Sequence, residues 1–185
     1  MTIISSIGGL LRRPEAGAFL GLSAVLIFFG IFGGVTFLQP AGMASWMNVA
    51  ANLGVIAIPV GLLMIAGELD ISVGAMVPFG AMTVAVISGH FGLPIWLGVA
   101  ASLSFGVLIG LINGYMVIRT AVPSLIVTLG SLFAVQGVVL GLTVLITKST
   151  SVALATEGPA KAIFGDFVLG GQLQAMVIWW LIVTA

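Results

Sequence analysis

The chain has 185 residues, of which 61% are hydrophobic and 5% charged, and its five basic and five acidic residues give a formal net charge of zero. A soluble domain carries about a quarter charged residues, so water is not the main solvent of this chain, and the absence of a basic surface argues against a nucleic-acid partner. With no cysteine and with His90 as its single histidine, the chain has no disulfide, thiol nucleophile or Cys/His zinc site. We therefore expect no metal and no cofactor.

The first apolar run predicts a transmembrane helix over residues 18–38, preceded by a cytoplasmic tail at 1–17. This run has about 20 residues, the length that crosses a bilayer, whereas the apolar core of a secretory signal has only ~7–15. The length favours a retained helix over a cleaved signal peptide. Gln39 and Pro40 are expected to end the helix, because proline lacks a backbone donor and restricts the residue before it.

Four further complete spans and one short apolar run follow. The expected spans, after an interfacial connection at 41–47, cover residues 47–66, 72–87, 95–113 and 123–146. Pro59 and Pro78 leave two alternatives for the second and third, either two full spans or one broken hairpin. The charged stretch 148–174 is predicted to be an exposed loop, and the apolar run after it is too short to cross about 30 Å of hydrocarbon.

The fold class predicted is all-α: a polytopic transmembrane helix bundle with about five complete spans and a truncated sixth. Residues 18–185 would form one membrane domain, incomplete at its C-terminus, as in a fragment or a truncated gene product. Because cytoplasmic loops retain Lys and Arg, we expect the N-terminus and Arg119 on the cytoplasmic side and the loop 148–174 on the periplasmic side. Trp46, Trp96, Trp179 and Trp180 then fall at outer boundaries, where aromatic rings are favoured.

The segment Gly67-Glu68-Leu69-Asp70-Ile71-Ser72-Val73-Gly74 places two carboxylates between apolar spans. Such carboxylates cost several kcal/mol unless they are hydrated or paired, so they are typical of functional positions. One interpretation is a kinked joint that lines a solute path or anchors a gate. The other is a helix cap, in which Asp70 or Ser72 accepts from the first free amides of the next helix. Both remain open, and Glu68, Asp70 and Ser72 are candidate site residues.

Several polar side chains lie within the predicted spans. They should face the bundle or a wet cavity, since lipid offers them no partners, and an ordinary helix-to-helix hydrogen bond is the simpler alternative for each. These residues are Asn48, Asn52, Asn113, Ser124, Thr128, Ser131 and Gln136. From this set we select Asn113, Ser124, Thr128 and Gln136 as candidates for the solute path or its gate.

One predicted helix carries small residues at every fourth position. Such a stripe lets another helix approach closely in lipid, and packing within the chain is favoured over a dimer interface. The residues are Gly98, Ser102, Gly106, Gly110 and Gly114.

Three ordered motifs resemble the permease subunits of ribose-type ABC sugar importers. They are the segment 67–74, Leu111-Ile112-Asn113-Gly114-Tyr115-Met116-Val117, and Val122-Pro123-Ser124-Leu125-Ile126-Val127-Thr128-Leu129-Gly130, within a similarity that covers about residues 48–142. Glu68 stands where that family often has glycine, and Gln136-Gly137 where an Arg-Gly pair is common. The charge pairing of the inner gate is therefore expected to differ here.

The resemblance implies a non-catalytic permease in the bacterial inner membrane, surrounded by membrane lipid. Its partners would be cytoplasmic ATPase subunits that hydrolyse ATP, a periplasmic solute-binding protein, and a second permease copy or paralogue. A monosaccharide or similar small polar solute would cross by alternating access. Two alternatives compete: a proton-coupled secondary transporter that uses Glu68 or Asp70 as its proton site, and a truncated remnant that transports nothing. Only the ABC permease explains all three motifs.

Overall fold

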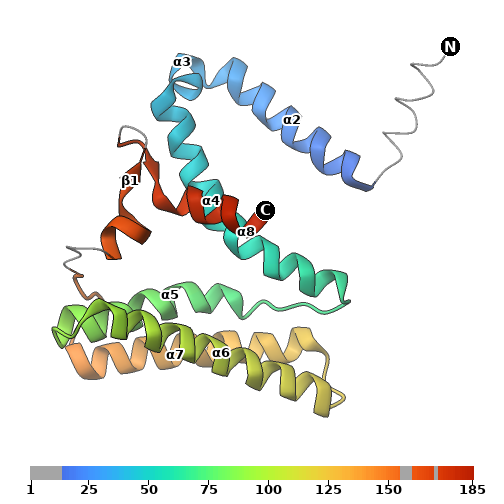
Figure 1. The fold of residues 1–185 in the computed structure, drawn as a ribbon. Coiled ribbons are helices and arrows are strands. Elements are labelled where there is room, and N and C mark those ends of the chain that lie inside the picture. The colour runs from blue at the N-terminus through green and yellow to red at the C-terminus, as the bar shows by residue number, and fades with distance from the viewer. Residues whose placement is uncertain (1–13, 155–159, 169–170) are drawn as a thin grey trace.

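The computed structural model describes residues 14–154, 160–168 and 171–185 (Figure 1). These residues are mostly helical, which confirms the all-α fold class. The long elements are α2 (Pro14–Phe32), α4 (Pro40–Ile65), α5 (Val73–Val84) continued by the π-helix η1 (Ala85–His90), α6 (Ile95–Arg119) and α7 (Ser124–Thr147). The shorter ones are α3 (Gly34–Leu38), η2 (Lys161–Gly165), the strands β1 (Phe167–Val168) and β2 (Leu173–Gln174), and α8 (Ala175–Thr184).

Within the described residues, four helices are long and apolar enough to cross a membrane. They are α4, the continuous helix Val73–His90, α6 and α7. The second and third expected spans are thus two membrane-length helices and not one broken hairpin: even the shorter, at 18 residues, extends about 27 Å at 1.5 Å per residue. The apolar helices Ala16–Phe32 and α8 are shorter than a full span. The chain is a multi-pass membrane protein.

Two expectations near the N-terminus are wrong. The single helix over 18–38 is interrupted between α2 and α3, where Gly34 has φ +69°, a left-handed conformation that glycine adopts without steric cost. The interfacial connection at 41–47 is absent, because α4 begins at Pro40 and continues through it. Proline is favoured at the first helical position, since its missing amide would have no helical partner there.

The stretch expected as a plain loop contains ordered structure in its described parts. Strands β1 and β2 pair antiparallel, with Phe167 opposite Gln174. Phe164 stacks on Trp179 with ring centroids 5.8 Å apart, and the indole of Trp179 donates a hydrogen bond to the Ile163 carbonyl at 2.9 Å. The aromatic ring of Trp96, at the start of α6, meets Phe164 edge-on at 6.3 Å. These contacts join the 160–174 region to α6 and α8.

The helices form two packed groups and an arm. Helices α5, α6 and α7 form one group in which each contacts the other two, α4 and α8 pack against each other, and α2 with α3 projects away (Figure 1). The buried positions are mainly small, such as Ala44, Ala51 and Ala75, while large apolar side chains cover the outside. This arrangement suits lipid, where close helix approach replaces the hydrophobic effect as the source of stability.

Candidate functional site

The segment between α4 and α5 is held against α7 by hydroxyl groups. The Leu69 amide donates to Ser124 Oγ at 3.2 Å, and the Ile71 amide donates to Thr128 Oγ1 at 3.3 Å. Thr128 Oγ1 in turn lies 3.3 Å from the Leu69 carbonyl, to which it can donate. A non-helical segment in a membrane protein lacks the backbone partners that a helix supplies, so these side chains satisfy groups that would otherwise be costly to bury.

Asp70 organises the start of α5 from within the same segment. One carboxylate oxygen, Oδ1, accepts from the Ser72 amide at 2.8 Å and from Ser72 Oγ at 2.6 Å. The contact is local and resembles a cap, although the amide it engages belongs to Ser72, the residue just before the helix. Ser72 itself donates its hydroxyl hydrogen to Asp70 and makes no capping bond to the helix. The cap predicted from the sequence is therefore not formed as such, because Asp70 bonds to Ser72 and not to an amide within α5.

A second chain of hydrogen bonds joins α5 to α6 and α7. The side-chain amide of Asn113 donates to Ser72 Oγ at 3.1 Å, and Ser131 Oγ donates to Asn113 Oδ1. Ser72, Asn113 and Thr128 are 3%, 4% and 3% exposed. We call the resulting cluster the polar junction; it consists of Asp70, Ser72, Asn113, Ser124, Thr128 and Ser131.

Five of the seven candidates for the solute path lie in the polar junction, and two do not. The side chain of Glu68 is half-buried and that of Gln136 is exposed, and neither has a hydrogen-bond partner among the described residues. Ser131 completes the junction although it was not selected as a candidate. The sequence did carry a signal for Ser131. Thr128 follows Ser124 by four residues and Ser131 follows Thr128 by three, so the three side chains share one helix face.

The stripe of small residues on α6 is only partly covered within the chain. A methyl group at Gly98 would lie 3.1 Å from the Val84 Cα. A methyl group at Gly80 would lie 2.9 Å from Ser102 Oγ. These two positions therefore allow close approach to α5 and η1. A methyl group at Gly106, Gly110 or Gly114 would meet nothing within 4 Å in the described structure.

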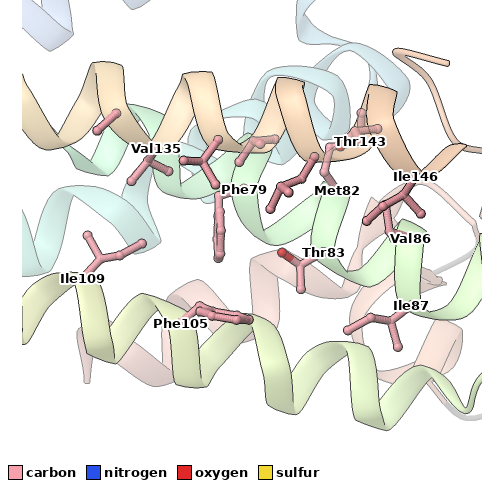
Figure 2. A pocket seen from close by; sticks show the side chains of 14 residues that line it. Phe79, Met82, Thr83, Val86, Ile87, Phe105, Ile109, Val135, Thr143 and Ile146 are labelled. Carbon is pink, nitrogen blue, oxygen red and sulfur yellow. The ribbon is translucent and has the colours of Figure 1, made fainter. Parts of the chain in front are cut away.

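An apolar groove of about 380 Å³ lies between α6 and α7 over α5 (Figure 2). Phe79 and Phe105 meet edge-on at its centre with ring centroids 5.7 Å apart. Among the lining residues, only Thr83 and Thr143 bring hydroxyl groups, and the other side chains are apolar. The groove offers a polar solute few hydrogen bonds, so the polar junction remains the better candidate. In the described parts of the chain, no three His, Asp or Glu side chains gather where they could hold a metal ion.

Residues 42–185 match the family described as "Branched-chain amino acid transport system / permease component". The chain belongs to this family. Among curated proteins it is 30% identical, over 91% of its length, to the xylose transport system permease protein XylH of Escherichia coli K12. It is also 29% identical over 69% of its length to the autoinducer 2 import system permease protein LsrD of Klebsiella pneumoniae. The fructose import permease protein FrcC of Rhizobium meliloti is 32% identical over 63% of the chain.

These matches confirm the resemblance to permease subunits of sugar importers. The alignments cover 47% of XylH, 38% of LsrD and 32% of FrcC, so the chain spans about half the length of the curated relatives or less. No solved structure gives a significant match.

Proposed function

We propose that the chain forms membrane-spanning permease segments of an ATP-binding-cassette importer that moves a monosaccharide or similar small polar solute across the bacterial inner membrane. One observation carries the proposal. The three motifs on which the resemblance rests, far apart in the sequence, meet in a single cluster: Asp70 and Ser72 come from the first, Asn113 from the second, and Ser124 and Thr128 from the third. The names of XylH and FrcC support a sugar as solute.

The polar junction is proposed to act as a joint between the helices that move during transport. Alternating access requires two arrangements of nearly equal free energy, between which a partner can shift the population. A single hydrogen bond contributes only about 0.5–1.5 kcal/mol net, so a joint made of several hydroxyl contacts can exchange partners at low cost. The links from Thr128 to Leu69 and from Asn113 to Ser72 are the contacts expected to change. Glu68 and Gln136 are proposed to act on the solute path outside the joint, since in the described structure neither side chain bonds to it.

The orientation proposed for the chain follows from its basic residues. Arg119 ends α6 only five residues before Ser124, so the polar junction lies at the same membrane face as this cation. The positive-inside rule favours the cytoplasm for that face, and we propose that the tail with Arg12 and Arg13 lies there too, which requires α2 and α3 together to cross the membrane. The ATPase subunits would therefore act on the junction's side, and the solute-binding protein and the segment 148–174 would lie on the periplasmic side. A second permease copy or paralogue would complete the path.

The test is uptake by the complete importer reconstituted in proteoliposomes with its ATPase and binding protein. We expect a substitution that abolishes ATP hydrolysis in the partner to abolish uptake of labelled sugar. Dissipating the proton gradient at constant ATP should leave uptake unchanged. Uptake that survives the ATPase-dead partner but stops with the proton gradient would replace our proposal with a proton-coupled transporter.

A further inference from the structure

A second, uncharged pocket lies where the first turns of α4 face the β1–β2 hairpin. Its volume is about 440 Å³. Ala41, Ser45 and Asn48 line it from α4 at spacings of four and three residues, which is one face of a helix. This pocket is distinct from the polar junction: Asn48 stands 17 residues before the end of α4 at Ile65, which is about 25 Å along the helix axis.

The two sides of the pocket are joined by the side-chain amide of Asn48. Its Nδ2 donates to the Gln172 carbonyl at 3.0 Å, and its Oδ1 accepts from the Gln174 amide at 2.9 Å. Both bonds go to the backbone, so the glutamine side chains themselves are not used. In the described parts of the chain, neither glutamine side chain nor the Ser45 hydroxyl has a hydrogen-bond partner. The structure thus fixes the hairpin on the helix and leaves three polar side chains available to a ligand.

The hairpin also supplies one aromatic ring. Phe167 pairs with Gln174 across the strands, and residues directly opposite in an antiparallel pair extend from the same face. Phe167 is 50% exposed and lines the pocket with Gln172 and Gln174. The lining therefore combines amides, a hydroxyl and a ring, and it contains no charged group.

We propose that this pocket binds a neutral monosaccharide, as a contact site on the solute path toward the membrane face opposite the polar junction; the inference rests on the proposed function for the identity of its ligand. Glutamine amides both donate and accept, as sugar hydroxyls do, and a ring can cover the apolar C–H face of a sugar. An ion would find no counter-charge, so its desolvation would not be compensated. The volume falls within the range of about 300–1,000 Å³ found for small-molecule sites.

The experiment measures equilibrium binding of radiolabelled probes by the full chain in lipid nanodiscs. The probes are D-xylose, D-fructose and, as a zwitterion of similar size, L-leucine. We expect saturable binding of at least one sugar and none of L-leucine. Gln174→Leu should raise the Kd of that sugar by about tenfold, since it removes the side-chain partners but keeps the backbone bond to Asn48. Phe167→Ala should weaken binding to a similar degree.

Gln39→Leu is the matched control. It makes the same chemical change one residue before α4, at a side chain that forms no cap bond and does not line the pocket. Its Kd should equal that of the unmodified chain, and the size-exclusion profiles of all variants should coincide. No saturable sugar binding, equal binding of L-leucine, or sugar binding unaffected by Gln174→Leu and Phe167→Ala would each overturn the inference.

The two proposals fail in different measurements. If uptake by the complete importer requires its ATPase while Gln174→Leu changes neither uptake nor binding, the pocket is not a sugar site and the proposed function stands. If uptake is independent of the ATPase while Gln174→Leu still weakens sugar binding, the pocket stands and the importer class is wrong.

Discussion

In the group of α5, α6 and α7, polar side chains of α6 and α7 converge on the segment that precedes α5, whereas α4 packs closely on α8 and is bound to β2 through Asn48. In the first region, Asn113 and Thr128 are almost completely buried, and each bonds to more than one partner. In the second region, a methyl group at Gly54 would lie only 2.1 Å from the indole nitrogen of Trp180. Hydrogen bonds that can exchange partners thus lie where we propose movement, whereas the close fit of side chains holds α8 against α4.

The largest effect on stability is expected at the close contact between α4 and α8. Gly54→Ala should destabilise the packing of α4 on α8 by about 2–3 kcal/mol, because the bulky ring of Trp180 must shift to make room. Reversible unfolding in mixed micelles measures the change in free energy. Gly61→Ala is the matched control on the same helix, where a methyl group meets nothing within 4 Å. Equal stability of the two variants would show that α8 does not pack on α4 in this way.

A smaller loss is expected at the centre of the polar junction. Asn113→Leu should cost about 1–2 kcal/mol, since it removes the bonds to Ser72 and Ser131 and leaves the Ser131 hydroxyl without its acceptor. The same unfolding assay applies. Asn52→Leu serves as the comparison, because in the described structure the Asn52 amide donates only to the Asn48 carbonyl within its own helix. A junction that contributes nothing would give the two variants the same stability.

A still smaller effect on stability, and the most informative one on movement, is expected at Thr128. Thr128→Val preserves the shape of the side chain and removes the hydroxyl that bridges the Ile71 amide and the Leu69 carbonyl, at a cost of about 1 kcal/mol. If the junction is a joint, the ATP-driven uptake rate of the complete importer should change several-fold while the sugar Kd at the hairpin pocket stays constant. Thr128→Ser, which retains the hydroxyl, should restore uptake. Unchanged uptake in Thr128→Val would reduce the junction to a structural contact.

A last prediction sharpens the contrast between residues inside and outside the junction. Gln136 is exposed on α7 and bonds to nothing in the described structure, so Gln136→Leu should change the free energy of unfolding by less than about 0.5 kcal/mol. The stability assay above provides the measurement. A loss comparable to that of Asn113→Leu would mean that Gln136 has a structural partner outside the described residues.

The amino-acid sequence determined the parts of this protein that depend on local chemistry. Apolar runs predicted its membrane helices, because a backbone in lipid must satisfy its own hydrogen bonds and a helix does so within one segment. The free-energy cost of placing polar side chains within a membrane identified Asp70 and Asn113 as candidate site residues before any contact was known. The one-face spacing of Ser124, Thr128 and Ser131 carried the further signal that Ser131 belongs with them.

Only the tertiary structure decided which distant groups meet. Hydropathy is nearly uniform along such a chain, so it does not encode which face of a helix meets which neighbour, and most faces here would look equally suited to lipid. The bonds of Asn48 to residues 124 and 126 positions away and the fit of Trp180 over Gly54 therefore had no local signature. Each depends on the three-dimensional packing of helices, where small residues and single polar groups select one arrangement among many of similar burial.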